Sequence, residues 1–372
     1  MIHNTVTHRQ AAAAVTVSLL SPLMRCLPRG AVRAAGKAAG LSVFLAVPLL
    51  LLLAVLTRSL LRELRPGEGL AGLIRRKLGP GIGRLLLLLY GLFFLFYAAF
   101  ILRSGGERLA AAVYQHSRPE PFFTVLLALA LLAALGTLRA LGRTAVILRG
   151  LLMAVLGGVS LLALPQVEPG NLLPLYREEL PGAVLGALPV TAAACPGALL
   201  LFLAGWLDPR ESAHSGIPRT LWVYLAAALL LIVLPVGTFG SHLTARLTYP
   251  FFTMVRDLSL FHLAQRIEAG VLALWIVADF LLSALLLRCA HEALRTLFGL
   301  PAPEGTAFFS GKNGRWLLWA EAAAILLGAL LLRTGNGELI HWSGTGLPWL
   351  ILGITFGGFA LVWLACRRRK RM

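Results

Sequence analysis

Two charged side chains lie inside apolar stretches of the sequence, where they could take part in binding chemistry. Asp279 follows Trp275 by four residues, so both lie on one face if this stretch is helical. A carboxylate inside such a segment could receive a ligand ammonium group or a proton, or it could be the structural partner of a basic residue. Arg25 could bind a ligand carboxylate or pair with Asp279. Alternatively, its long side chain reaches the membrane interface beside Arg29.

Two stretches near these residues each contain two prolines. Pro22 and Pro28 flank Arg25, and Pro189 and Pro196 lie in a later apolar stretch. Because proline lacks a backbone N–H and clashes with the preceding turn, we expect both stretches to be broken helices. Backbone groups freed at such breaks can bind a small polar ligand, although proline is also frequent in membrane helices without this role. The predicted ligand-binding residues are Ser21, Leu23, Arg25, Tyr97, Ala194, Cys195, Gly197, Trp275, Asp279 and Ser283.

Several of these candidates have a simpler structural interpretation. Tyr97 is seven residues after Tyr90, so the pair could line a site or could pack and anchor a helix. Cys26 and Cys195 could approach each other, but we favour the simpler interpretation that both are small apolar residues at close helix contacts. Glu321 lies near the expected cytoplasmic start of its segment, where we expect it to reach the interface.

Other kinds of chemistry find no support in the sequence. The eight histidines are scattered, and the four cysteines fit no zinc or CxxC spacing. No phosphate-binding Walker motif and no nucleophile–base arrangement is present. We therefore expect no enzyme activity, no metal and no other cofactor.

The elements that must position these residues are membrane helices. Of 372 residues, 58% are hydrophobic and only 13% are charged, and runs of about 20 apolar residues recur along the chain. The sequence predicts an all-α polytopic membrane protein, with residues 1–372 forming a single membrane domain that ends in a basic tail at 367–372. The expected segments are about ten in number: 11–35, 41–61, 85–102, 122–138, 146–164, 183–206, 221–239, 267–287, 316–332 and 347–366.

The charge of the chain bears on its orientation. Lys and Arg number 34 against 16 Asp and Glu, which gives a net charge of +18. In a soluble protein this would suggest nucleic acid, but no basic-aromatic module is present and the charges lie at segment ends. They therefore indicate orientation and contact with the lipid bilayer rather than nucleic acid. An even number of segments, with Arg367–Arg371 at the end, predicts both termini in the cytoplasm.

The two proline-interrupted segments, the first and the sixth, occupy matching places in two halves of the chain. This pattern is typical of transporters built from inverted five-helix repeats, whose broken helices meet near the bilayer midplane. We therefore expect a leucine-transporter-like 5+5 inverted repeat, with repeat one at about 8–165 and repeat two at about 182–366.

Residues 247–287 resemble the spore germination permease family, whose members are the B-type membrane subunits of endospore germinant receptors. The features that carry this resemblance are Tyr249-Pro250, Val255-Arg256, Ser259, Phe261, Arg266-Ile267-Glu268, Trp275 and Phe280. Shorter matches lie at Leu27-Pro28-Arg29, Pro165, Pro169, Asn171–Pro174, Gly186–Pro189 and Asp208-Pro209. The chain departs from the family at Ser21-Pro22-Leu23, where members usually carry a Gly-x-Gly-like pair. It also lacks a carboxylate at Cys195-Pro196-Gly197, and Asp279 replaces an apolar or glycine residue.

The resemblance implies a fold and a function. The family belongs to the amino acid–polyamine–organocation transporter group and has ten segments. The chain is thus expected to be a germinant-receptor subunit in the spore inner membrane, sensing a small nutrient, such as an amino acid, and triggering germination through subunits A and C. Asp279 favours an alternative, an ion- or proton-coupled amino acid transporter. The departures favour another, a divergent scaffold subunit without a ligand.

Overall fold

The computed structural model describes residues 5–112, 117–207, 216–258, 267–301, 311–332, 342 and 344–368. Within these residues the protein is almost entirely helical, and the described part contains no strand, only an isolated bridge between Val6 and Leu207. The predicted all-α class is therefore confirmed. Ser259, Phe261, Arg266 and Asp208-Pro209 of the family motifs lie outside the described residues, as do the Cys26 side chain and residues 369–372 of the basic tail.

The helices follow one another with short connections. In chain order they are α1 (His8–Ala35), α2 (Ala39–Leu45), α3 (Val47–Leu61), α4 (Leu70–Leu78), α5 (Ile82–Ala112), α6 (Glu120–Leu135), α7 (Leu138–Ala163), α8 (Pro169–Leu172), α9 (Leu180–Leu199), α10 (Gly216–Arg246), α11 (Pro250–Asp257), α12 (Ile267–Phe298), α13 (Gly311–Leu331), α15 (Gly346–Leu352) and α16 (Gly358–Arg368). Short segments of tighter or wider helix join some of them: η1 (Gly36–Ala38), η2 (Leu164–Gln166), η3 (Arg177–Glu179), η4 (Leu200–Trp206) and η6 (Gly353–Gly357).

Many of these helices are long and apolar enough to cross a bilayer. By length and composition, the described ranges contain 8 such spans, so the chain is an integral membrane protein. Helix α6 has only 16 residues, and the stretch Leu27–Leu61, which includes the end of α1 together with α2 and α3, counts as one span. The expected ten segments and the inverted repeat therefore stay predictions.

Local signals define both ends of α1. The Thr7 hydroxyl accepts a hydrogen bond from the backbone N–H of Gln10 (3.3 Å), and the Gln10 side chain accepts one from the backbone N–H of Thr7 (3.2 Å). This reciprocal pair satisfies two N–H groups that the first turn leaves free. At the other end Gly36 adopts a φ of +55°, where the Glu179 carboxylate lies so close that a Cβ would be 2.5 Å from its Oε1 atom.

The predicted breaks in the first and sixth segments are wrong. Helix α1 continues from His8 to Ala35 through Pro22 and Pro28, and α9 continues through Pro189 and Pro196 before tightening into η4. An interior proline costs a helix about 3 kcal/mol. Packing offsets this cost, because α1 is surrounded by α7, α9, α10 and α12, and tertiary contacts supply most of a helix's stability in a folded protein.

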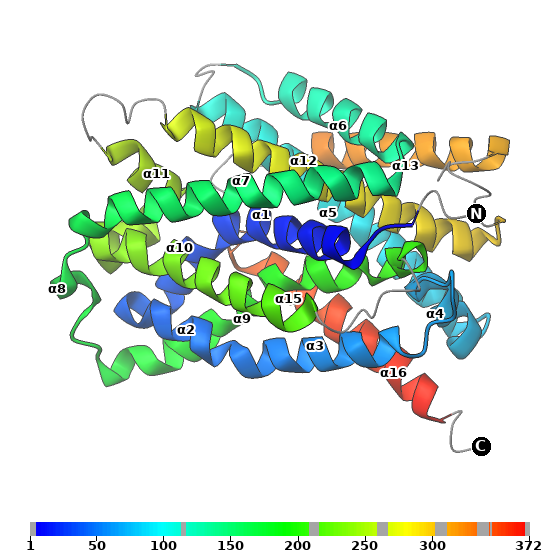
Figure 1. Cartoon of the computed structure of the whole chain (residues 1–372), viewed down its shortest axis with the longest axis horizontal. Helices are drawn as coiled ribbons and strands as arrows, with labels where there is room; N and C mark the ends of the chain where they lie inside the picture. The colour runs from blue at the N-terminus through cyan, green and yellow to red at the C-terminus, as the bar shows by residue number, and fades with distance from the viewer. Residues whose placement is uncertain are drawn as a thin grey trace.

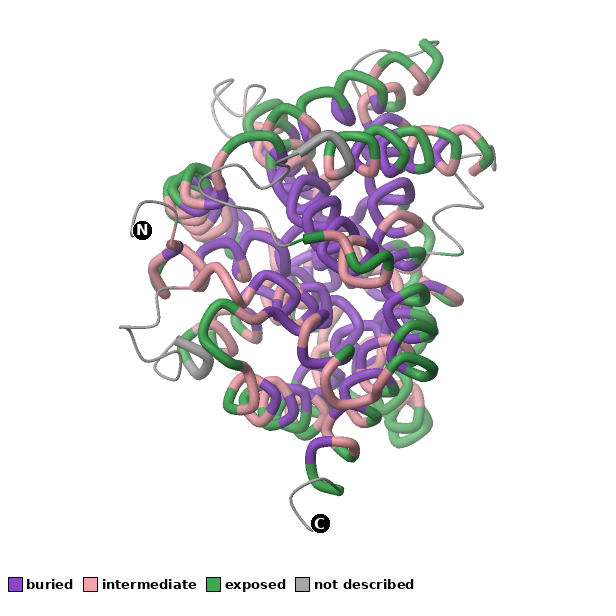
Figure 2. Tube along the Cα trace, turned by 90° about the vertical axis from the view of Figure 1, so that its right-hand side faces the viewer, coloured by how far each residue is buried: buried purple, intermediate pink, exposed green. Residues whose placement is uncertain are grey.

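The helices form an elongated bundle with a buried centre. Figure 1 shows the long helices running roughly side by side, with α7 and α10 in front of α1. Figure 2 shows that buried residues fill the central helices and that exposed residues lie on the outer ones. Large apolar side chains such as Val55, Ile147 and Leu161 are exposed on the outside, which suits contact with lipid.

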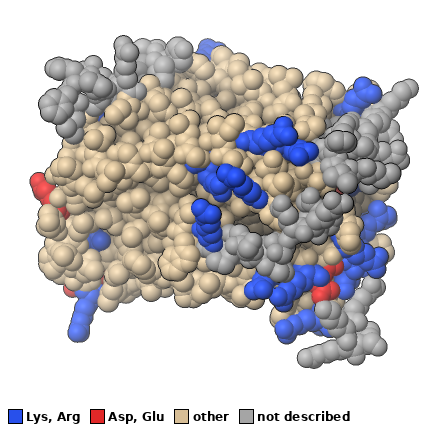
Figure 3. All heavy atoms as spheres, in the orientation of Figure 1, with Lys and Arg blue, Asp and Glu red and all other residues tan. Residues whose placement is uncertain are grey.

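The first and last described parts of the chain lie at the same end of the bundle. The backbone N–H of Val6 donates to Trp206 at the end of η4 (2.9 Å), and Gly205 packs directly against Gly67 in the α3–α4 loop. Helix α16 packs against α4, on the right-hand side of Figure 1. Basic side chains gather at this end in Figure 3.

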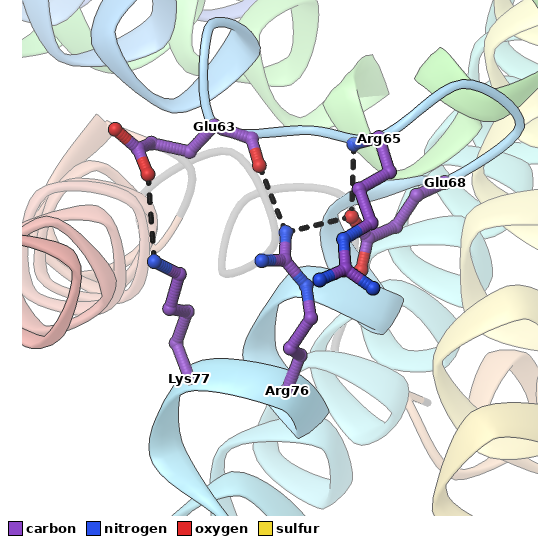
Figure 4. Close-up of polar contacts among 5 residues, drawn as sticks. All are labelled: Glu63, Arg65, Glu68, Arg76 and Lys77. Atoms are coloured by element: carbon purple, nitrogen blue, oxygen red, sulfur yellow. Dashed lines mark hydrogen bonds and ion pairs between the residues drawn. The ribbon is translucent and has the colours of Figure 1, made fainter. Parts of the chain in front are cut away.

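An ion cluster holds the α3–α4 loop at this end (Figure 4). Arg76 on α4 donates to Glu68 in two hydrogen bonds (3.0 and 2.8 Å) and to the backbone carbonyl of Glu63 (2.8 Å). Lys77 lies 3.5 Å from the Glu63 carboxylate, and Glu68 also accepts from the backbone of Arg65. The hydrogen bond to Glu68 raises the pKa of Arg76 above its usual value. The two hydrogen bonds from Arg76 to the Glu68 carboxylate form a bidentate pair, which fixes the orientation of the loop as well as its position.

Candidate functional site

Asp279 lies at the centre of a buried polar cluster. Its Oδ1 atom accepts a hydrogen bond from Arg25 Nη2 at 2.6 Å and another from the Ser21 hydroxyl, and its Oδ2 atom forms an ion pair with Arg108. The Arg25, Arg108 and Asp279 side chains are only 2%, 1% and 1% exposed. Three helices that are far apart in sequence, α1, α5 and α12, therefore meet at one carboxylate.

Helical spacing places these groups toward one another. Ser21 and Arg25 are one turn apart on α1, and Arg25 Nη2 also donates to the Ser21 hydroxyl (3.3 Å). On α12, Trp275 and Asp279 are likewise one turn apart. Helices α5 and α12 pack tightly because Gly91 faces Leu294, where a Cβ would lie 2.6 Å from a leucine methyl group. A larger residue at position 91 would force the Leu294 side chain to shift.

Aromatic rings cover the two guanidinium groups. Arg108 lies 3.8 Å from the Trp275 ring centroid, which is a close cation–π contact, and Arg25 lies 5.8 Å from the centroid of Phe100. Tyr249, just before α11, meets Trp275 edge to face with centroids 5.4 Å apart. Burial raises the pKa of the Tyr249 phenol, so it stays neutral beside the cluster. The rings therefore shield the charges from lipid and water.

A second ion group adjoins this cluster along α5. Arg103 donates to Glu107 (2.5 Å) and lies 3.9 Å from Glu120 at the start of α6. The Asp279 cluster itself contains two guanidinium groups and one carboxylate. Such buried charges are stable only while each keeps its partners, so removal of one partner is costly. Chemically, the cluster can exchange one ion pair for another.

The structure brings together only some of the predicted site residues. Ser21, Arg25, Trp275 and Asp279 meet in the cluster, and the predicted pairing of Arg25 with Asp279 is confirmed. Ala194 and Gly197 instead line a separate apolar cavity. Whether any of these residues binds a ligand stays a prediction.

The remaining predicted residues pack elsewhere in the interior. Tyr97 stacks on Phe93 with centroids 5.7 Å apart, and the Cys195 thiol donates to the carbonyl of Thr191 (3.5 Å). Leu23 is fully buried in the apolar core. Ser283 lies one turn beyond Asp279 on α12, and its buried hydroxyl makes no hydrogen bond within the described residues.

Sequence reasoning missed Arg108, which it counted among the charges at the outer segment ends. Helix α5 is 31 residues long and carries Arg108 inside the bundle. A signal was available, because Tyr97, Ile101, Ser104 and Arg108 recur at helical spacing and so share one face of α5.

The expected exposure of Glu321 is also wrong. Glu321 on α13 lies 3.2 Å from His291 Nδ1 on α12, and both side chains are 1% exposed. A partner on the neighbouring helix therefore replaces contact with the interface. Among the described residues, no three His, Cys, Asp or Glu side chains are grouped so that they could hold a metal ion.

The described helices and the buried ion cluster define a polytopic helical membrane protein. The chain is similar to a solved structure described as a substrate-bound, outward-open Na⁺-coupled sialic acid symporter, with a TM-score of 0.56 and 14% identity over 93% of this chain and 78% of that one. At this identity the likeness shows the fold alone.

The chain belongs to the spore germination protein family, whose family model matches residues 5–311. It is also 22% identical over 306 residues to spore germination protein KB of Bacillus subtilis (strain 168), an alignment that covers 79% of this chain and 78% of that protein. The predicted family membership is thereby confirmed, and the protein is a membrane protein related to germination.

Proposed function

We propose that this protein is the membrane subunit of a spore germinant receptor and that it senses a small nutrient, most simply an amino acid. Its family and its transporter-like fold support this proposal. The observation that carries it is the cluster of Ser21, Arg25, Arg108 and Asp279, buried where three helices meet. Ionised groups inside a membrane domain are costly and typically mark functional sites.

An amino acid has charges that complement this cluster. Its carboxylate would pair with Arg25 or Arg108, since a guanidinium binds a carboxylate in a bidentate way. Its ammonium group would pair with Asp279. Each new ion pair replaces an existing one, so the buried charges remain compensated during the exchange. A neutral nutrient of the same size would not offer this compensation.

The same exchange supplies a signal. A ligand can shift a protein between two states only by binding one of them more tightly. Without a ligand, the ion pairs of Asp279 with Arg25 and Arg108 connect α1, α5 and α12. A ligand that binds at Asp279 would replace these ion pairs and weaken the contacts among the three helices. Because α1 also packs against α7, α9 and α10, its displacement would change the surface presented to partner subunits. We propose that subunits A and C of the receptor are the partners that bind this surface.

The proposed location is the spore inner membrane, with both termini in the cytoplasm. The gathering of basic side chains at the end of the bundle where the first and last described residues lie supports this orientation, because Lys and Arg are enriched in cytoplasmic loops.

Isothermal titration of the purified protein, together with its partner subunits, against a panel of amino acids tests the proposal. We expect one amino acid to bind wild type and not Asp279→Asn, with the titration carried out at a temperature at which thermal unfolding shows both proteins to be folded. The matched control is Asp257→Asn, an exposed acid at the end of α11, which should bind like wild type. Absence of binding to wild type in the presence of its partners contradicts sensing and favours a scaffold subunit.

A second function, ion-coupled transport, is favoured by the fold shared with a symporter. Uptake into proteoliposomes separates the two. Binding without accumulation of the bound amino acid supports the sensor, whereas accumulation that disappears in Asp279→Asn supports the transporter.

A further inference from the structure

An apolar cavity lies inside the bundle, separate from the Asp279 cluster. Its volume is about 250 Å³, and it is bounded by α1, α3, α7, α9 and α10. Small residues at the wall, among them Ala11, Ala54, Gly142 and Ala198, leave this space open. Cavities of about 150 Å³ with apolar walls stay dry and bind apolar molecules, so this one has room for a hydrocarbon chain.

Three arginines lie close together beside this cavity. Arg9 follows His8 and Arg219 precedes Thr220, and both of these neighbours line the cavity. Arg149 lies two helical turns along α7 from Gly142, on the same face of that helix. Arg149 is near enough to Arg9 and Arg219 to be repelled by both. In the part of the chain that the structure describes, no carboxylate forms an ion pair with any of the three.

Arg149 is deep for a positive charge that has no ion pair within the described residues. It lies 11 residues after Leu138 at the start of α7, which corresponds to about 16 Å along the helix. This position is inside the apolar span Leu138–Gln166, and the residue is only partly buried. A positive charge in that environment is costly unless an anion or water accompanies it. The mutual repulsion of the three arginines adds to the need for an anion.

We propose that the cavity and the arginines Arg9, Arg149 and Arg219 form a binding site for an anionic phospholipid of the surrounding bilayer. One acyl chain fills the cavity, and the phosphate pairs with the arginines. Basic pockets between membrane helices typically bind acidic headgroups. In Figure 3 basic side chains border a hollow on the face formed by α7 and α10. This inference does not depend on the proposed nutrient site.

The two halves of the site together select this class of ligand. A small soluble anion would satisfy the arginines but leave the apolar walls without a partner. A neutral lipid would fill the cavity but leave three positive charges uncompensated. A phospholipid with net negative charge supplies both groups in one molecule, and the bilayer holds it at high local concentration.

Native mass spectrometry of the full-length protein in detergent tests the proposal. The protein is mixed with equal amounts of phosphatidylglycerol and phosphatidylcholine that carry identical acyl chains. We expect phosphatidylglycerol to be retained in preference. Arg149→Gln and Arg219→Gln should each lower this preference about fivefold, the factor that corresponds to the contribution of one basic residue near an anionic surface. Arg246→Gln, an exposed arginine at the other end of α10, is the matched control and should keep the wild-type preference.

A second variant tests the cavity rather than the charges. Ala54→Leu places a larger side chain in the cavity wall and should reduce retention of both lipids. Arg9 and Arg219 are exposed, so Arg9→Gln and Arg219→Gln carry the test if Arg149→Gln does not fold. Equal retention of the two lipids by wild type, or a wild-type preference in every arginine variant, overturns the proposal. Displacement of phosphatidylglycerol by an equal amount of oleate overturns the phospholipid in favour of a free fatty acid.

Discussion

Arg108 and Asp279 form an ion pair in which each side chain is only 1% exposed. Arg25 approaches the other oxygen of the same carboxylate, and the Trp275 ring covers Arg108. Solvent therefore screens none of these contacts. A pair this buried contributes little net stability compared with apolar residues of the same shape, but breaking it on one side leaves an uncompensated charge.

Asp279→Asn should be strongly destabilising for this reason. It leaves two guanidinium groups buried without their anion, and removing one partner of a buried ion pair costs about 3–5 kcal/mol. Thermal unfolding in detergent, compared between wild type, Asp279→Asn and Asp257→Asn, measures the effect. We expect a large loss of stability for the first variant and none for the exposed control.

Replacement of the whole cluster separates charge compensation from packing. A triple variant with Arg25→Met, Arg108→Met and Asp279→Leu removes all three charges at similar volume. It should recover most of the stability lost in Asp279→Asn, because no buried charge remains unpaired. If the triple variant is as unstable as the single one, the loss comes from packing and our account of the cluster is wrong.

Trp275→Leu should lower the stability of the protein by removing the cation–π contact with Arg108. The Arg108 guanidinium lies 3.8 Å from the ring centroid, and a desolvated cation–π contact contributes about 2 kcal/mol. Leucine removes the π face, whereas Trp275→Phe keeps part of it. We expect the order of thermal stability to be wild type, then phenylalanine, then leucine. Equal stability of the last two variants would show that the π face does not contribute to the stabilisation of Arg108.

The buried pair of Glu321 and His291 predicts a difference between two substitutions at one position. Glu321→Gln keeps a side chain of the same shape that can still hydrogen-bond the imidazole. Glu321→Ala removes the hydrogen bond between this side chain and His291 Nδ1, and a hydrogen bond typically contributes about 0.5–1.5 kcal/mol. Denaturant unfolding should therefore show alanine as clearly less stable than glutamine. A reversed order would mean that a hydrogen bond from position 321 to the imidazole does not stabilise the fold.

The sequence carried enough information to predict the membrane helices and one of the central ion pairs. Apolar runs of the right length define helices by themselves, because a bilayer admits few other structures. Arg25 and Asp279 stood out because charge is rare inside such runs. Arg108 did not, because it lies near the end of a long helix, where a basic residue usually marks the interface. Only the packing of α5 against α12 shows that it points inward.

The predicted ligand set shows the same limit. The residues at the prolines were grouped on the assumption that the helices break there and meet. Because α1 and α9 continue, the helix faces decide which residues meet: Arg25 faces Asp279, whereas Ala194 and Gly197 face the apolar cavity. Local propensity treats a proline as a break, whereas tertiary packing determines whether the helix continues.

Substitution of the two α1 prolines tests this last point directly. Alanine is favoured over proline by about 3 kcal/mol in a helix interior and restores one backbone N–H. Because α1 is already helical through both positions, we expect Pro22→Ala and Pro28→Ala to have a thermal stability equal to or higher than that of wild type. Both prolines are buried, so the loss of their ring contacts reduces the gain. Pro48→Ala in the first turn of α3 is the control, since proline is tolerated there and little should change. If both α1 variants lose stability while the control does not, the prolines shape α1 in a way that a continuous helix does not explain.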